Sequence, residues 1–355
     1  MATTRMLGGL VGRFLAKGEE TSFHVPGALG EDSRILAIDT GDLSDLLFHA
    51  SLLRAIRDRY PRSRIDVLLP EHHTPLVRES GFARNCIEYT AKQLRTWTPG
   101  YVALARGIRK HDYDLCVVMS FEAHPALEAI ALASGAPLRL GPSHRSSYPA
   151  VNFEVRAPQG DQRYRGTRLA ATAPFLGLAD GDVRPGWPLP EEKVRKTRQL
   201  VHFNKPRKDE ILVGVDPSLG KSGAGLSLPN LNFLLNQLQS QMPIRVLPLC
   251  AGGATDRLDQ FQAALTQAPM NLPAGTMFDT VVMTSLCDLF LAGNTDLFHF
   301  AAAQGVPVIG LFVKEDEPTW EPAHYDNVRI LRVAEGKRVD VDTLLDAVRS
   351  VRGGR

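Results

Sequence analysis

The sequence predicts an α/β protein built from two doubly wound domains. Short apolar runs alternate with segments of helical periodicity along nearly the whole chain, a pattern typical of parallel sheets with right-handed crossovers. The 355 residues exceed what one hydrophobic core usually supports. A stretch rich in proline and charge, residues 180–207, lies near the middle and indicates a connection between domains.

The first domain is predicted over residues 34–185. Its expected strands are 35–38, 64–69 and 114–119, and its expected helices are 46–60, 75–80, 101–110 and 125–133. An interdomain connection with a helix over 191–201 follows at residues 186–209.

The second domain is predicted over residues 210–335. Its expected strands are 211–215, 245–249, 289–291 and 308–312, its expected helices are 231–241, 256–265, 280–287 and 296–303, and a further segment covers 328–333. Residues 336–355 close the chain with a helix over 341–351.

Residues 1–33 precede the first domain as a basic amphipathic helix, 1–17, and a linker. Five apolar residues from Leu7 to Leu15 recur at helical spacing among Arg5, Arg13 and Lys17. No small-residue cleavage site follows, which argues against a secretory signal. Such a helix either lies on an anionic membrane surface or packs on the body of the protein.

The composition excludes several classes of protein. Hydrophobic residues make up 44% of the chain, yet no apolar run is long enough to cross a bilayer. The 41 Lys and Arg against 39 Asp and Glu leave a formal charge of +2, so no overall field attracts nucleic acid. The four cysteines form no C-x-x-C pair, which fits a reducing cytoplasm, and with no H-E-x-x-H we expect no metal site.

The turn after the first predicted strand brings three carboxylates to a strand end, where α/β domains place their sites. These are Asp39, Asp42 and Asp45. Asp45 lies where the next helix begins, so its charge would stabilise that helix. Alternatively, Asp45 acts as a general base that deprotonates an attacking hydroxyl.

The segment 214–222, GVDPSLGKS, follows a strand and approaches the phosphate-binding pattern G-x-x-x-x-G-K-S. The spacing fails by one residue, and Gly223, Gly225 and Pro229 interrupt the helix that such a loop needs. We therefore expect a flexible loop whose Lys221 neutralises a phosphate or is simply solvated. No G-x-G-x-x-G or G-x-S-x-G follows a strand, which disfavours a dehydrogenase or an esterase.

Residues 292–312 read as a loop, a helix of small residues and a buried strand. A helix that begins here would direct the amides of Thr295, Asp296 and Leu297 toward an anion. The alternative is a well-capped core helix.

These segments together resemble glycosyltransferase family 9, which includes the lipopolysaccharide heptosyltransferases. The resemblance rests on ILAIDTGDLSDLLFHASLLRAIRDRYP from residue 35, DPSLGK from 216, LCAGGATDR from 249 and NTDLFHFAAAQGVPVIGLF from 294. It implies a GT-B fold, in which two Rossmann-like domains face a central cleft. It also implies metal-independent, inverting transfer from a nucleotide-sugar such as ADP-heptose to a lipid-linked saccharide, with no cofactor, in the cytoplasm or at the inner membrane surface.

The resemblance also suggests roles for particular residues. Asp45 matches the catalytic aspartate, and Thr295 and His299 match positions of the family's D-T-G-x-x-H motif. Donor-binding positions are expected at Ser218, Lys221, Asp256, Asn294, Thr295, Asp296, Leu297 and His299.

Two departures affect the donor site. Asn294 replaces the family's aspartate, and Asp296 replaces its glycine. A carboxylate about 4 Å from a phosphate would repel it by roughly 4 kcal/mol at an effective dielectric near 20, about a thousandfold in affinity if nothing compensates. Two alternatives therefore stay open beside the enzyme: a non-catalytic relative that serves in binding or assembly, and an NTPase of the P-loop type.

Overall fold

The computed structural model describes most of the chain after residue 28. The described residues are 29–96, 98–120, 122–142, 148–155, 164–179, 181–183, 186–205, 207–251, 255–273, 275–322, 325–334 and 339–352. The helix predicted over 1–17 lies outside them. The chain divides into two compact units, one of Met1–Asp161 with Gly166–Pro188, the other of Gln162–Arg165 with Leu189–Arg355.

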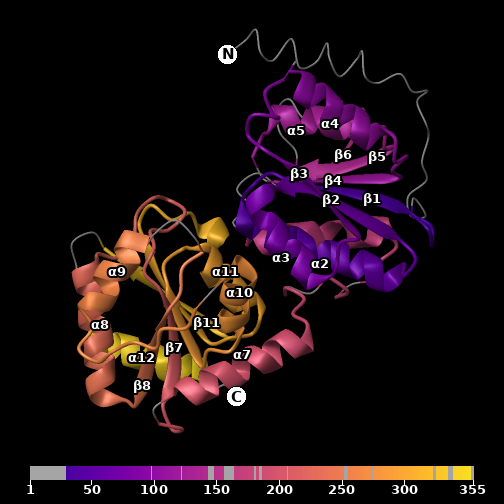
Figure 1. Cartoon of the computed structure of the whole chain (residues 1–355). Coiled ribbons are helices and arrows are strands. Elements are labelled where there is room, and N and C mark those ends of the chain that lie inside the picture. Colours follow the sequence, from indigo (N-terminus) through magenta and orange to yellow (C-terminus); the bar gives the residue numbers. More distant parts are fainter. Residues whose placement is uncertain are drawn as a thin grey trace. The chain divides into compact units, whose positions relative to one another are not determined.

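The first unit contains a six-stranded, wholly parallel sheet in the order β3-β2-β1-β4-β5-β6 (Figure 1). Its strands are β1 (Arg34–Asp39), β2 (Arg64–Pro70), β3 (Asn85–Tyr89), β4 (Leu115–Met119), β5 (Leu138–Pro142) and β6 (Phe153–Val155). Its helices are α2 (Leu43–Arg59), α3 (Thr74–Ser80), α4 (Pro99–Arg109) and α5 (Pro125–Ser134), with a short η1 (Glu71–His73). Next in the chain come α6 (Arg165–Arg168) and η2 (Leu169–Leu176).

Helices cover both faces of this sheet. In Figure 1, α4 and α5 lie on one face and α2 and α3 on the other. Burial on both faces explains why the central strands β1 and β4 are apolar along their length rather than alternating. The order of strands reverses between β1 and β4, and in such sheets ligands bind at the carboxyl ends beside the reversal.

The second unit repeats the design with a five-stranded parallel sheet in the order β11-β10-β9-β7-β8. Its strands are β7 (Ile211–Asp216), β8 (Ile244–Pro248), β9 (Leu289–Ala292), β10 (Val308–Val313) and β11 (Val328–Val333). Its helices are α7 (Glu191–Asn204), α8 (Leu228–Gln241), α9 (Thr255–Ala263), α10 (Met277–Ser285), α11 (Asp296–Ala303), α12 (Val341–Arg352) and the short η3 (Pro318–Trp320). The order reverses between β7 and β9, so the loops after these two strands flank the reversal.

Close packing in this unit depends on two glycines inside strands. A Cβ on Gly214 of β7 would lie 2.5 Å from the Phe290 ring and 2.6 Å from the Cys287 sulfur. A Cβ on Gly310 of β10 would lie 2.7 Å from Ile330. Both positions therefore exclude any side chain, and the side chains of Cys287, Phe290 and Ile330 pack directly on the bare backbone.

The α/β fold predicted from the sequence is confirmed, and most predicted elements fall within a few residues of the observed ones. Three strands, β3, β5 and β6, were not predicted. The division between the units at Pro188 lies inside the predicted connection 186–209, whose helix α7 packs on α10 as part of the second unit. The return of Gln162–Arg165 to the second unit was not predicted either.

Candidate active site

The carboxyl end of β1 carries the three carboxylates singled out in the sequence, and they have different surroundings. Asp42 is the N-cap of α2, and its side chain accepts hydrogen bonds from the amides of Ser44, at 2.9 Å, and Asp45, at 3.0 Å. Gly41, with a φ of +99°, allows the turn that places Asp42 there. Capping of α2 thus belongs to Asp42, which leaves Asp45 in the first turn of the helix.

Asp39 has a structural role. Its side chain is fully buried, accepts from the Gly41 amide at 2.8 Å, and lies 2.6 Å from Nδ1 of His73. Its carbonyl accepts from the hydroxyl of Tyr89. These bonds tie β1 to η1 and β3. His73 is a partner that the sequence analysis did not identify.

Asp45 lies in the first turn of α2, with a side chain that is buried, at 4% exposure for the residue. One turn later, the Nδ1–H of the buried His49 donates to the carbonyl of Asp45 at 2.7 Å. Burial lowers the pKa of His49 to about 4, so the imidazole is neutral at pH 7. Asp45 is therefore held on a rigid helix beside a neutral ring, which fixes its position.

In the second unit, the loop after β7 is joined to the loop after β9. The amide of Lys221 donates to the carbonyl of Asn294 at 2.7 Å. A Cβ on Gly220 would lie 3.1 Å from the Ala224 carbonyl and 3.2 Å from that of Asn294. Glycine thus permits the close approach that brings Lys221 to the carboxyl edge of the sheet.

Helix α8 begins at Leu228, seven residues after Lys221. A P-loop needs a helix that starts at once, so that its amide dipoles meet the phosphates. This loop is therefore not a P-loop. Its Ser218 instead hydrogen-bonds to the buried carboxyl of Asp216 through both its amide, at 3.0 Å, and its hydroxyl.

Helix α11 begins beside Lys221. Thr295 is its N-cap, and the threonine hydroxyl accepts from the Phe298 amide at 3.4 Å. The Thr295 amide already donates to the carbonyl of Gly293 at 2.9 Å. Of the three amides expected to meet an anion, those of Asp296 and Leu297 remain in the first helical turn, where no intrahelical acceptor exists.

Lys221 compensates the unexpected charge of Asp296. Its Nζ lies 2.5 Å from Oδ1 of Asp296, and the two side chains are 16% and 26% exposed. The repulsion of about 4 kcal/mol between Asp296 and a phosphate applies to a carboxylate that no cation compensates. The ion pair with Lys221 provides this compensation.

A second cation lies near Lys221 on the ring of Trp320. The guanidinium carbon of Arg165 lies 4.2 Å from the centre of this ring, and Nζ of Lys221 lies 5.2 Å from it. Arg165 also pairs with the exposed carboxylate of Glu317 at 3.0 Å. Two cations, each paired with a carboxylate, thus lie on one aromatic ring beside the start of a helix.

A buried chain of hydrogen bonds supports this site. Tyr164 donates its hydroxyl to Nδ1 of His299 at 2.9 Å, and Nε2–H of His299 donates to the side-chain oxygen of Asn294 at 3.0 Å. The amide nitrogen of Asn294 then donates to Asp316 at 3.2 Å. We assign these directions because the Asp316 carboxylate accepts only.

His299 is neutral because it is buried beside two cations. Burial, together with the positive charges of Lys221 and Arg165, holds the pKa of His299 well below 6.5. A neutral imidazole has one donor and one acceptor nitrogen, as the chain from Tyr164 to Asn294 requires. The substitution Asn294 fits this chain because its amide offers an oxygen to His299 and a nitrogen to Asp316.

Asp256 differs from the other candidates. It is exposed in the first turn of α9. Its neighbour Arg257 bonds the carbonyls of Pro217 and Leu226, the second at 2.8 Å, and so supports the Lys221 loop.

Tyr164, Arg165 and Arg257 were missed by the sequence analysis. No local pattern marks the first two, since they come from a four-residue segment of the chain surrounded by residues of the other unit. Trp320 lies in η3, after β10, and only its position beside two cations shows its role.

No group of three or more His, Cys, Asp and Glu side chains is placed to hold a metal ion within the described part of the chain. No described helix is long and apolar enough to cross a membrane.

Comparison with solved structures identifies the fold. A structure of the Escherichia coli ADP-heptose lipopolysaccharide heptosyltransferase II aligns with a TM-score of 0.69 at 19% identity, covering 90% of this chain and 99% of that one. A family 9 glycosyltransferase structure from Veillonella parvula aligns with a TM-score of 0.72 at 14% identity, covering 94% and 100%. The two doubly wound units are thus those of the GT-B fold, the architecture of a large class of glycosyltransferases.

The sequence places the chain within that class. The model of glycosyltransferase family 9 (heptosyltransferase) matches residues 101–345, so the chain belongs to this family and is a transferase. Lipooligosaccharide heptosyltransferase 2 of Haemophilus influenzae is 26% identical over 332 residues, covering 86% of this chain and 90% of the relative. The family membership predicted from the motifs is confirmed.

Proposed function

We propose that this protein transfers a heptose from a nucleotide-sugar such as ADP-heptose to a lipid-linked saccharide of the lipopolysaccharide core. The relatives of the chain include lipopolysaccharide and lipooligosaccharide heptosyltransferases, and the Escherichia coli structure is that of an ADP-heptose lipopolysaccharide heptosyltransferase. The observation that carries the donor assignment is the pair of cations, Lys221 and Arg165, on Trp320 beside the first turn of α11.

The donor diphosphate binds beside these two cations. Lys221 turns from Asp296 toward the phosphates as they enter, and Arg165 contributes a second positive charge. Bond cleavage leaves negative charge on the departing diphosphate, and these cations with the Asp296 and Leu297 amides stabilise it. The chain from Tyr164 through His299 to Asn294 keeps the two loops in place.

Asp45 is the general base. Its carboxylate removes the proton of the acceptor hydroxyl while that oxygen attacks the anomeric carbon of the heptose, and the sugar–phosphate bond breaks on the opposite side. One in-line displacement inverts the configuration at that carbon. The reaction needs no metal, because cationic side chains and amides carry the leaving group. It takes place in the cytoplasm, where the lipid-linked acceptor meets the enzyme at the inner membrane surface.

The test combines binding with turnover. Calorimetry with ADP, UDP and GDP is expected to show tight binding of ADP, whereas absence of binding to all three at millimolar concentration would support a non-catalytic protein.

Asp45→Asn is expected to lose about a thousandfold or more in kcat, consistent with loss of a general base, with ADP affinity unchanged. The matched control is Asp42→Asn, which removes a charge from the same turn but keeps an N-cap. An active Asp45→Asn enzyme would contradict the base assignment.

A further inference from the structure

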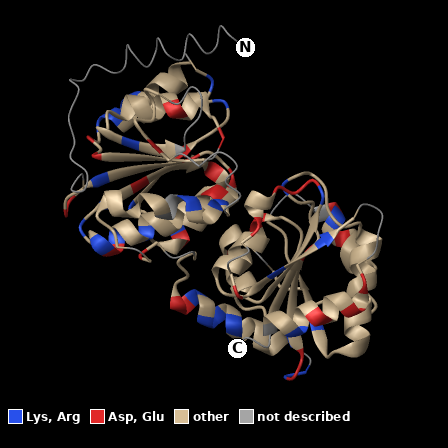
Figure 2. Ribbon diagram, turned by 180° about the vertical axis from the view of Figure 1, so that it is seen from behind, with Lys and Arg blue, Asp and Glu red and all other residues tan. Residues whose placement is uncertain are grey.

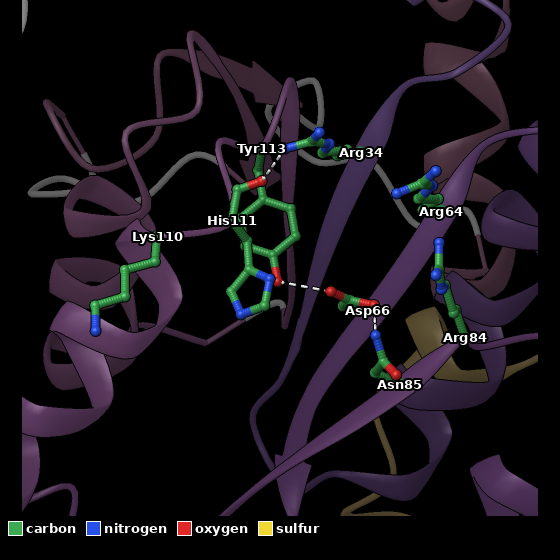
Figure 3. Close-up of a pocket in the computed structure, with 8 residues that line it drawn as sticks. All are labelled: Arg34, Arg64, Asp66, Arg84, Asn85, Lys110, His111 and Tyr113. Carbon is green, nitrogen blue, oxygen red and sulfur yellow. Dashed lines mark hydrogen bonds between the residues drawn. The ribbon is translucent and has the colours of Figure 1, made fainter.

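The first unit has a basic pocket at the edge of its sheet opposite to Asp45. The pocket has a volume of about 320 Å³ and is lined by Arg34, Arg64, Asp66, Arg84, Asn85, Lys110, His111 and Tyr113 (Figure 3). Arg34, Arg64 and Asn85 are the first residues of β1, β2 and β3. They mark the amino edge of the parallel sheet, whereas Asp45 follows the carboxyl end of β1. The pocket is therefore separate from the site of the proposed transfer.

Charge is concentrated in this pocket although the chain as a whole is nearly neutral. Figure 2 shows basic and acidic residues interspersed over both units, as the formal charge of +2 requires. The pocket holds four Arg and Lys side chains against one carboxylate, which leaves a formal charge of +3 with His111 neutral. All four cations are exposed, so water reduces their mutual repulsion, and an anion bound among them would reduce it further.

The only carboxylate among the lining residues, Asp66, is engaged elsewhere. Asp66 is buried, and its two oxygens accept from the side-chain amide of Asn85 at 2.8 Å and the hydroxyl of Tyr113 at 2.9 Å. Burial raises the pKa of Tyr113, so its hydroxyl stays protonated and keeps donating. Asp66 thus organises the floor of the pocket and forms no ion pair with its arginines.

The cations of the rim have few partners. Arg34 donates to the carbonyl of His111 at 3.0 Å, a neutral acceptor. Among the described residues, no carboxylate forms an ion pair with Arg64, Arg84 or Lys110 at 4.0 Å or less. In Figure 3 the side chain of Arg84 extends toward Arg64.

We propose that this pocket binds a phosphate group, with Arg64 and Arg84 as its principal ligands. A planar guanidinium donates two parallel hydrogen bonds to phosphate oxygens. Two guanidinium groups carry two positive charges, which match a phosphate or pyrophosphate better than they match a carboxylate with its single negative charge. A volume near 300 Å³ lies at the lower end of small-molecule pockets and suits a phosphorylated metabolite or the headgroup of an acidic lipid. The phosphate chemistry is common to both sources.

The first experiment uses inorganic pyrophosphate as the probe, in calorimetry on the full-length protein at constant ionic strength. The Lys221→Gln variant removes competition from the proposed donor site. In that background, Arg64→Gln/Arg84→Gln is expected to weaken binding by about tenfold or more, since each substitution removes a charge-assisted contact. The control Lys92→Gln/Arg95→Gln removes two exposed cations of the same unit outside the pocket and is expected to bind as Lys221→Gln does.

The second experiment separates the two sources. Co-sedimentation with phosphatidylcholine vesicles, with and without phosphatidylglycerol, is compared for wild type and Arg64→Gln/Arg84→Gln. Binding to the acidic vesicles that needs both arginines and is displaced by pyrophosphate identifies a lipid headgroup. Pyrophosphate binding that needs both arginines, without vesicle binding, identifies a soluble ligand.

The proposal is overturned if pyrophosphate fails to bind the Lys221→Gln protein at millimolar concentration, or if Arg64→Gln/Arg84→Gln binds it as tightly. Circular dichroism and a urea titration establish that each variant is folded. This inference does not rest on the proposed transfer reaction. Its failure would leave ADP binding by the wild type unchanged.

Discussion

At the scale of single residues, one substitution changes the chemistry of the proposed donor site. Asp296 places a carboxylate where the family motif has glycine, and Lys221 pairs with it at 2.5 Å. In the unliganded protein the pair neutralises both charges. Donor binding must draw the lysine toward the phosphates, so part of the binding free energy is used to weaken this ion pair.

Removing the carboxylate while keeping the lysine is expected to strengthen nucleotide binding. Asp296→Asn frees Lys221 and eliminates a like charge near the diphosphate, so the Kd for ADP is expected to fall about tenfold, or about 1.4 kcal/mol. Lys221→Gln is expected to raise it by a similar factor. Calorimetry measures both. Asp209→Asn, in the fully exposed pair with Arg207, is the control and is expected to change nothing. Weaker ADP binding by Asp296→Asn would show that Asp296 contributes to binding instead.

At the scale of elements, the first turn of α2 shows how a short motif separates structural from chemical roles. Of the three aspartates at the carboxyl end of β1, Asp39 joins the strand to η1 through His73, Asp42 caps the helix, and Asp45 lies one turn from the cap. Two roles were expected for Asp45, stabilisation of the helix dipole by its charge or action as a general base. In the structure the N-cap is Asp42, and Asp45 lies in the first turn of the helix.

The cap predicts a measurable loss of stability. Asp42→Ala leaves the amides of Ser44 and Asp45 without their acceptor, and the free energy of unfolding is expected to fall by about 1 kcal/mol. Urea denaturation measures it. Asp42→Ser restores a cap and is expected to recover most of the loss. Equal losses in both variants would refute the capping role.

The buried His49 of α2 makes stability depend on pH. Burial lowers its pKa from 6.5 to about 4, so below pH 6.5 the unfolded chain takes up a proton that the folded protein does not. The associated stability is complete above pH 6.5 and is lost as the pH falls toward 4, by of order 3 kcal/mol. His49→Asn, which keeps a donor for the Asp45 carbonyl, is expected to flatten the profile between pH 6.5 and 4. His299 accounts for further dependence in the same range, and an unchanged profile would contradict the assignment to His49.

Strand and helix prediction succeeded or failed for identifiable reasons. Apolar β1, β4 and β9 are buried on both faces and stand out in the sequence, and the glycines after α3 and α5 end those helices with positive φ. Edge strand β3 contains Asn85 and Glu88, and β5 contains Arg139, so their apolar signal is weak.

The site itself was predictable only in part. Lys221, Asn294, Thr295, Asp296 and His299 follow strands in sequence, so motif and topology together place them at one sheet edge. Arg165 and Trp320 arrive by tertiary packing that no local pattern encodes. The ion pair of Lys221 with Asp296 links residues 75 positions apart, which is why the charge of Asp296 had seemed uncompensated.

At the scale of the whole molecule, each unit has its own sheet and its own hydrophobic core, and the proposed donor groups belong to the second unit. Ligand binding stabilises the structure that forms its site.

Saturating ADP is therefore expected to slow hydrogen exchange in the segments around Lys221, Asn294 and Trp320, with smaller effects in β1 to β4. Mass spectrometry of peptides from the full-length protein measures this. Asp45→Asn is the control, because it should leave the protection unchanged. Protection confined to the first unit would place the nucleotide elsewhere.

The brief return of Gln162–Arg165 limits how the protein can be divided. A gene cut at Pro188 yields a carboxyl-terminal fragment with every strand of the second sheet, yet without Tyr164 and Arg165. His299 would then lose its hydroxyl donor, and Trp320 its guanidinium neighbour. A chimera joined at Pro188 would combine the amino-terminal part of one relative with the carboxyl-terminal part of another. Its second unit would then contain Gln162–Arg165 from one parent and the rest of the proposed donor site from the other. The sequence boundary of the domain is thus not the boundary of its binding site.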